Sequence, residues 1–91
     1  MTTEQQIQIK KKNPAWSKRF KELQMAYMNF PHLLSGKRVN EILDIGNTTR
    51  FYLHREGKLQ KIKLGDKVQS QAKYTKDSVL ALIVDWEINA K

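Results

Sequence analysis

Residues 41–65, EILDIGNTTRFYLHREGKLQKIKLG, lead from a short apolar stretch through two threonines into alternating lysines. Ser35 can cap a first helix, which Asp44-Ile45-Gly46 interrupts. Aspartate accepts the left-handed backbone of a tight break better than most residues do. A second helix follows the break, and Gly57 is placed to end it as a C-terminal glycine. Two short helices around a tight break predict a helix-turn-helix over residues 35–57.

Beyond the second helix, the period of the sequence changes from that of a helix to that of a strand. Apolar and polar side chains alternate over residues 59–64, and Gly65-Asp66 is a favourable two-residue turn. The returning strand, KVQSQAKY, covers residues 67–74. The segment 59–74 therefore predicts a β-hairpin wing that is rich in lysine and glutamine.

A helix with a narrow aromatic stripe is predicted upstream of the helix-turn-helix, over residues 14–30. Asn13 can cap this helix, Pro14 is tolerated in its first turn, and Pro31 ends it. The stripe must pack against another surface, which is either the protein's own core or a partner chain. Its large side chains recur at spacings of 4, 3, 4 and 3 residues: Trp16, Phe20, Leu23, Tyr27 and Phe30.

The last predicted helix, residues 75–90, is capped by Thr75 and is apolar on two nearly opposite faces. Such a helix must be covered on both sides. One face is expected to meet the helix-turn-helix, and the other is expected to meet the N-terminal helix or a second chain. The first face holds Val79, Leu82, Ile83, Trp86 and Ala90, and the second holds Leu80, Ala81, Val84 and Ile88.

These elements predict one domain, residues 13–91, preceded by a flexible basic arm, residues 1–12. The expected fold is mainly α with a small β-hairpin wing: a winged helix-turn-helix with an additional N-terminal amphipathic helix and a C-terminal helix. An interface with a partner or with a second copy is a further interpretation of the two outer helices. Its candidate residues are Trp16, Phe20, Leu23, Tyr27, Leu80, Val84 and Ile88.

The charge of the chain favours a polyanionic partner. Its 91 residues hold 17 lysines and arginines against 9 acidic residues, a net charge of +8. Residues 46–76 carry a net charge of +6, residues 1–45 carry +4, and residues 77–91 carry −2. The excess is therefore largest over the helix-turn-helix and wing, which makes nucleic acid the first partner to consider.

Several classes of function are not expected from this sequence. It has no cysteine, its two histidines are far apart, and no apolar run is long enough to suggest a membrane span. It also lacks a glycine-rich phosphate loop, a paired-carboxylate motif and a recognisable Ser/His/Asp arrangement. We therefore expect a cytoplasmic protein that is not an enzyme, has no cofactor or metal and does not bind a membrane.

The stretch from Leu34 to Gly65 resembles the small winged helix-turn-helix domains of the excisionase and AlpA-like families, which are related to the MerR group. The family pattern aligns with this chain without a gap, and the resemblance covers roughly residues 34–84. Asn40 stands where the family has alanine, and Arg50 and His54 replace apolar residues. The matching anchors are Leu34, Val39, Glu41, Ile42, Leu43, Ile45, Thr49, Phe51, Leu53, Gly57, Lys58, Leu59, Ile62, Lys63, Leu64 and Gly65.

The resemblance implies that the helix from Asn47 enters the major groove of DNA and that the wing follows the backbone. Asparagine and arginine can pair with base edges, threonine can touch a thymine methyl group, and lysines can hold phosphates. Tyr52 could contact the groove or stack on an unpaired base. The DNA-binding candidates are Lys37, Arg38, Asn47, Thr48, Thr49, Arg50, Tyr52, Arg55, Lys58, Lys61, Lys63, Lys67 and Gln69.

Two functions remain open at this point. The first is a duplex-DNA-binding protein of a phage or mobile genetic element, acting as an excisionase-like architectural factor or a small transcriptional regulator, with an integrase as a partner. The second is an accessory subunit that docks on a replication or primase-polymerase enzyme and helps to bind single-stranded DNA. A homodimeric repressor is a third, simpler alternative.

Overall fold

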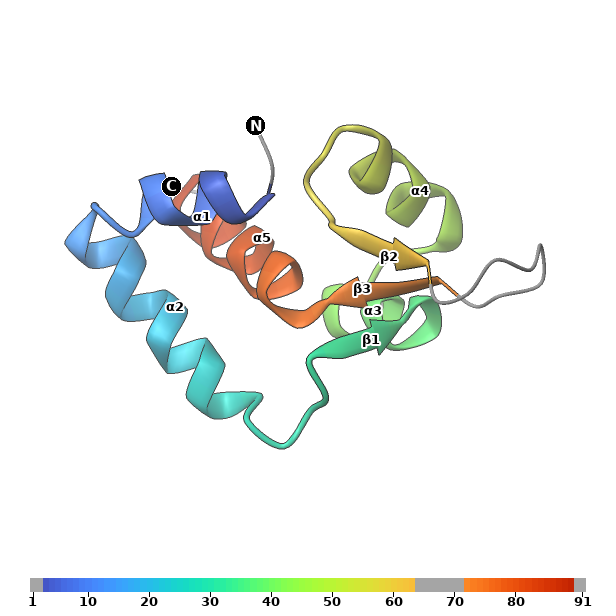
Figure 1. Cartoon of the computed structure of the whole chain (residues 1–91), viewed down its shortest axis with the longest axis horizontal. Coiled ribbons are helices and arrows are strands. Elements are labelled where there is room, and N and C mark those ends of the chain that lie inside the picture. Colours follow the sequence, from blue (N-terminus) through green and yellow to red (C-terminus); the bar gives the residue numbers. More distant parts are fainter. Residues whose placement is uncertain (1–2, 64–71, 90–91) are drawn as a thin grey trace.

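A small antiparallel sheet and a long central helix organise the computed structural model of this protein, which describes residues 3–63 and 72–89 (Figure 1). These residues are mainly helical, as the sequence predicts. In chain order the elements are α1 (Thr3–Lys10), α2 (Pro14–Ala26), β1 (Leu33–Ser35), α3 (Gly36–Leu43), α4 (Asn47–Arg55), β2 (Lys61–Lys63), β3 (Ala72–Thr75) and α5 (Lys76–Asn89).

The break between α3 and α4 forms where the sequence predicts it. The Ser35 side chain accepts a hydrogen bond from the backbone of Arg38 and so caps α3. Asp44 ends that helix in the left-handed conformation, with φ 55° and ψ 52°. Gly57, with φ 79°, follows α4. Local chemistry therefore determines the position of both helices of the helix-turn-helix.

The sheet contains a strand that the sequence did not predict. Among the described residues, β3 is the central strand, and β1 and β2 both pair with it in antiparallel orientation. Leu34 lies opposite Tyr74 in the first pair, although forty residues separate them in the chain. The three strands thus form one antiparallel sheet, although two helices separate β1 from β2 along the chain.

The predicted two-residue turn at Gly65-Asp66 does not fit the pairing of the hairpin. Lys63 lies opposite Ala72, which leaves residues 64–71 between the paired strands. A two-residue turn would instead bring Val68 opposite Lys63. The predicted turn itself lies outside the described residues, as do the parts of the two predicted strands next to it.

Helix α5 is covered on both faces over residues 79–84, as its sequence predicts, whereas Trp86 and Ile88 near its end are exposed. Val79 and Leu82 pack in one cluster with residues of the sheet, α3 and α4. Leu80 and Val84 pack on the other side, against α2. Figure 1 shows α5 between α2 on one side and the sheet with α3 and α4 on the other. The alternative that a second chain covers α5 is therefore not needed for these residues.

Most of the predicted interface residues lie inside the protein. Five of the seven candidates belong to the cluster between α2 and α5. Each of these five residues is at most 6% exposed, so none of them offers a surface to a partner. Of the seven candidates, Tyr27 is half-buried and Ile88 is exposed. The buried candidates are Trp16, Phe20, Leu23, Leu80 and Val84.

The N-terminal segment is not the flexible arm that its polarity suggested, because Thr3–Lys10 forms helix α1. Ile7 is buried in the cluster between α2 and α5. The Asp85 carboxylate on α5 pairs with the Lys10 ammonium and accepts a hydrogen bond from Trp16 Nε1 at 2.9 Å. Helix α1 is thus attached to α5 by the buried Ile7 and by the Asp85 carboxylate, which also accepts the hydrogen bond from Trp16 of α2.

Helix α2 ends earlier than predicted, at Ala26. The buried Lys76 Nζ donates hydrogen bonds to the carbonyl oxygens of Tyr27 (3.2 Å) and Phe30 (3.1 Å). Phe30 lies beyond the helix. It packs against the cluster formed by the sheet, α3, α4 and one face of α5, and not in the cluster that holds Trp16 and Phe20 of α2. The first residue of α5 therefore holds the segment that leads from α2 into the sheet.

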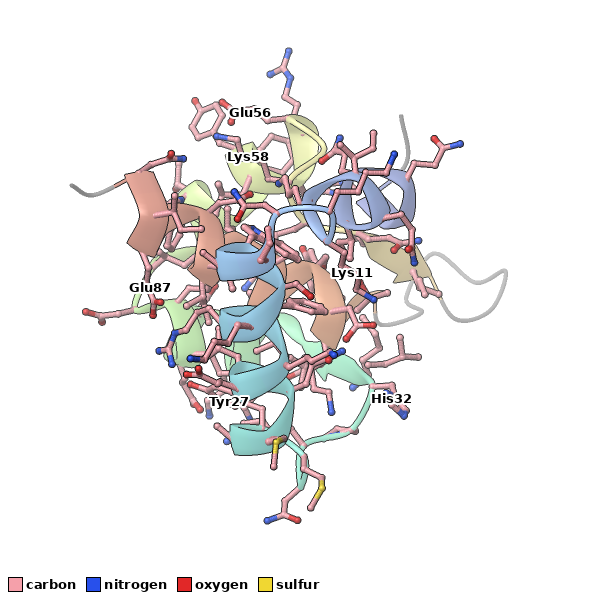
Figure 2. All side chains as sticks on the ribbon, turned by 90° about the vertical axis from the view of Figure 1, so that its left-hand side faces the viewer. Lys11, Tyr27, His32, Glu56, Lys58 and Glu87 are labelled. Atoms are coloured by element: carbon pink, nitrogen blue, oxygen red, sulfur yellow. The ribbon has the colours of Figure 1, made fainter. Side chains whose placement is uncertain are left out.

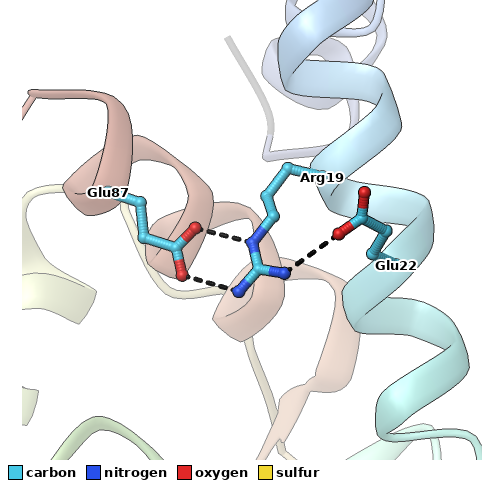
Figure 3. A network of polar contacts seen from close by, with 3 residues as sticks. All are labelled: Arg19, Glu22 and Glu87. Carbon is cyan, nitrogen blue, oxygen red and sulfur yellow. Dashed lines mark hydrogen bonds and ion pairs between the residues drawn. The ribbon is translucent and has the colours of Figure 1, made fainter.

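A surface arginine also joins α2 to the end of α5 (Figure 3). Arg19 donates to both carboxylate oxygens of Glu87, from Nε at 2.7 Å and from Nη2 at 3.0 Å, and it also pairs with Glu22 at 3.1 Å. The hydrogen bonds from Arg19 lower the pKa of Glu87 below its ordinary value of 4.5. The ionised form of Glu87 is therefore favoured in the folded protein.

The Glu87 pair should stabilise the fold in a pH-dependent way. Because the folded-state pKa of Glu87 is lowered, its contribution is present above pH 4.5 and is lost as the pH falls through the lowered pKa. Glu87→Gln should lower the free energy of unfolding at neutral pH, by a small amount because the pair is exposed. The difference in the free energy of unfolding between Glu87→Gln and the wild type should vanish in strong acid, where Glu87 is protonated.

Urea denaturation across the acid range measures this effect. Glu22→Gln is the matched control, since it leaves the bidentate ion pair between Arg19 and Glu87 intact. A Glu87→Gln variant that equals the wild type at neutral pH would show that the pair does not contribute.

Candidate nucleic-acid interface

Helix α4 exposes one continuous face along its whole length. Leu53 is buried, and Arg50 and His54 are half-buried, so these three residues mark the inner side of the helix. The outer side carries side chains at the spacing i, i+3, i+4, i+7, which places them on one stripe. These exposed residues are Thr48, Phe51, Tyr52 and Arg55.

Arg50 belongs to a polar network inside the helix-turn-helix. Its Nη1 donates to the side-chain oxygens of Asn40 (3.0 Å) and Asn47 (3.1 Å). Asn40 Nδ2 also donates to Asn47 Oδ1, at 2.7 Å. The three side chains connect α3 to the first turn of α4.

The guanidinium of Arg50 is enclosed as well as hydrogen-bonded. Its Cζ lies 5.7 Å from the centre of the Tyr74 ring. A Cβ placed on Gly36 would lie 2.7 Å from the same Cζ, so only glycine leaves room for it. Arg50 Nε is buried and has no hydrogen-bond partner among the described residues. The side chain is therefore turned into the protein in this structure, away from any base that α4 would approach.

The residues that depart from the family pattern thus contact one another or their neighbours. Asn40 and Arg50, which both replace apolar residues, are partners in one network. His54 Nδ1 lies 3.5 Å from the Leu59 carbonyl, and its ring meets the edge of Tyr74. Polar contacts and ring packing replace part of the apolar packing that the family pattern would supply.

The predicted phosphate contacts are exposed wherever the structure describes them. Lys37, Arg55 and Lys61 lie on the surface. The other two form weak surface ion pairs: Lys58 with Glu56 at 3.4 Å, which Figure 2 shows near the end of α4, and Arg38 with Glu41 at 3.5 Å. Such pairs contribute little and are easily exchanged for a phosphate.

The other predicted DNA contacts divide into two groups. Thr48, Thr49 and Tyr52 are exposed on α4, whereas the Asn47 oxygen accepts two of the three hydrogen bonds in the network of Arg50, Asn40 and Asn47. The wing candidates Lys67 and Gln69 and the side chain of Lys63 lie outside the described part of the chain. The structure therefore brings the α4 candidates together and does not place those of the wing.

Phe51 is a surface residue that the sequence interpretation assigned to the anchors of the fold. It is 58% exposed, its neighbour Tyr52 is 55% exposed, and the two rings meet edge to face at 6.2 Å. The helical phase could have revealed this, because Leu53 is the clear inner residue and Phe51 lies about 200° away from it around the helix. The outer face of α4 therefore carries two aromatic rings.

A second apolar surface lies at the end of α2. Met25 and Met28 are 75% and 72% exposed. A cavity of about 190 Å³ lies next along the chain, lined by Asn29, Phe30, Pro31 and Arg38. The sequence interpretation did not single out these methionines, of which Met25 lies in the last turn of α2 and Met28 just beyond it.

Other classes of site find no support in the described residues. None of the helices in residues 3–63 and 72–89 has the length and apolar character to cross a membrane. The same residues contain no group of three or more histidine or acidic side chains arranged to hold a metal ion. Comparison with protein-family models, curated proteins and solved structures found no match to this chain.

The close contact between Gly36 and Arg50 predicts that substitutions at these positions are coupled. Gly→Ala within a helix ordinarily stabilises by about 0.5–1 kcal/mol. Gly36→Ala should stabilise the protein less than this or not at all, because the new Cβ forces the Arg50 guanidinium to shift. In an Arg50→Ala background the same change should stabilise by the ordinary amount, which gives a coupling energy of about 0.5 kcal/mol.

Thermal or urea denaturation of the four proteins of this cycle measures the coupling. Gly46→Ala is the control, since a Cβ there meets no atom within 4 Å, and its effect should be the same with and without Arg50. Additive effects of Gly36→Ala and Arg50→Ala would contradict the enclosed position of the guanidinium.

Proposed function

We propose that this chain is a non-enzymatic, cytoplasmic DNA-binding protein of a phage or mobile genetic element. It acts as an excisionase-like architectural factor or a small transcriptional regulator, and it approaches duplex DNA with α4 and the wing. The observation that carries the proposal is the exposed outer face of α4, which follows the tight break after α3, ends in Arg55 and is followed along the chain by the exposed Lys58 and Lys61.

Electrostatics supports a DNA partner for this face. Helix α4 contains no acidic residue, and the chain as a whole has a net charge of +8. Arg55 lies at the end of the outer stripe, Lys58 and Lys61 follow it, and Lys37 and Arg38 begin α3. These five exposed cations supply the phosphate contacts, which dominate the affinity of most DNA-binding proteins.

The contacts to the bases differ from those that the family resemblance implied. Thr48, Thr49 and Tyr52 are exposed on α4 and would face the groove. Arg50 acts from inside: it holds α4 against α3 through Asn40 and does not pair with a guanine. Arg50 therefore positions the helix, and the exposed face makes the contacts.

The proposal predicts a strong dependence of DNA affinity on salt. With about five phosphate contacts, the slope of log affinity against log salt concentration should be near −4.5. Arg55→Gln should make this slope shallower by about 0.9 and should weaken binding to all sequences alike. Fluorescence anisotropy with a labelled duplex at several salt concentrations measures both quantities.

Arg19→Gln is the control, because Arg19 pairs with Glu87 at the junction of α2 and α5 and not on the α4 face. Its slope should equal that of the wild type. A wild-type slope shallower than about −2 would refute the phosphate-dominated interface.

A second function is favoured by the apolar surface at the end of α2. Exposed methionines adapt to varied partner surfaces, and the neighbouring cavity could accept an apolar side chain. This surface suits an accessory subunit that docks on a larger enzyme of the same element, for example a primase-polymerase, and helps it to bind single-stranded DNA. An integrase would be the corresponding partner of an excisionase.

The double variant Met25→Glu/Met28→Glu tests this docking surface. It should abolish co-elution with the enzyme encoded beside this chain, because it places two carboxylates in an apolar contact. DNA binding by the chain alone should be unchanged. Size-exclusion chromatography of the co-expressed proteins measures the association, and Lys18→Gln/Lys21→Gln on α2, which changes the net charge by the same amount, is the charge-matched control. Undiminished co-elution of the methionine variant would exclude this surface as the docking site.

A further inference from the structure

We infer that α4 binds DNA in which bases are unpaired or unstacked, and that the rings of Phe51 and Tyr52 stack on those bases. This inference rests on the proposed DNA-binding function and specifies its ligand. It applies to single strands, to internal loops in a duplex and to the edges of melted regions, which all expose the flat faces of bases.

The first step concerns the exposed rings. Phe51 and Tyr52 are both more than half exposed, and they occupy the middle of the outer stripe of α4. Among the described residues, the only aromatic partner of each ring is the other ring, in an edge-to-face contact. Because an edge-to-face pair covers only part of the two rings, ring surface remains open to a flat ligand.

The second step concerns the groups that usually read a duplex. The major groove presents the edges of base pairs, which arginine and asparagine read with paired hydrogen bonds. In this protein the side chains of that kind in the first turn of α4, Asn47 and Arg50, are joined to Asn40 in the internal network. Helix α4 is therefore poor in groups that read base edges and rich in groups that contact base faces.

The third step concerns the choice of nucleic acid over a protein surface. Arg55 follows Tyr52 by three residues and Phe51 by four, so a cation lies beside both rings on the same helix face. Lys58 and Lys61 continue the positive charge, and α4 has no carboxylate that would repel a phosphate. Aromatic side chains beside a row of cations are the usual composition of a site for unpaired bases and their backbone.

Anisotropy with the full chain and three labelled probes of the same length tests the inference: an intact duplex, the same duplex with a short central mismatch bubble, and the single strand. The bubble and the single strand should bind more tightly than the duplex. Phe51→Ala and Tyr52→Ala should each weaken binding to these two probes by about 5- to 150-fold, the range expected for the loss of one base–aromatic stack. Binding to the intact duplex should change much less.

Conservative variants separate stacking from damage to the fold. Phe51→Tyr and Tyr52→Phe keep a ring at each position and should retain the preference for unpaired bases. Phe51→Leu keeps apolar surface without a ring and should lose it. Circular dichroism should give all variants the same helical content, because both side chains lie outside the core.

The outcomes distinguish this inference from the function on which it rests. Equal affinity for the three probes, unaffected by Phe51→Ala and Tyr52→Ala, would overturn the inference and leave DNA binding in place. Failure to bind any probe would overturn both. Alanine variants that bind all three probes normally but no longer co-elute with the enzyme encoded beside the chain would assign the rings to a protein contact and would also overturn the inference.

Discussion

The two-sided burial of α5 is the constraint on which the rest of the structure depends. Val79 and Leu82 close the cluster under the sheet and the helix-turn-helix, while Leu80 and Val84 on the opposite face hold α2. A domain of this size has little apolar surface to spare, so one helix that serves two clusters replaces a larger core. The short α3 and α4 keep their positions because α5 supports the sheet that packs beside them.

The small amount of apolar surface also explains why polar groups occupy the crossing of α3 and α4. Where the family pattern has apolar residues, this chain joins Asn40 to Arg50, and the Tyr74 ring and Gly36 enclose the guanidinium. A partly satisfied network of this kind contributes less stability than apolar packing, and Arg50 Nε illustrates the deficit. What the network does contribute is geometry, because its hydrogen bonds fix the first turn of α4 relative to α3.

Features set by local chemistry were predictable from the sequence, and those set by distant partners were not. The caps at Asn13 and Ser35, the left-handed Asp44 and the two faces of α5 follow from neighbouring residues and were predicted. Strand β1 exists only because Leu34 meets Tyr74, and α1 packs only because Ile7 reaches the cluster beside α5. For the candidate site, the location on α4 was predictable, but the inward position of Arg50 depends on a contact with another helix.

The buried inner side of α4 and its exposed aromatic side have different roles in the proposed binding. A stacking surface is effective when its rings are held in place before the ligand arrives, since little freedom is then lost on binding. Leu53 and the Arg50 network fix the inner side of the helix, so the backbone that carries Phe51 and Tyr52 is anchored close to both rings. In the proposed binding mode, the network of Asn40, Asn47 and Arg50 thus occupies the groups that would read base edges and also orients the aromatic face of α4.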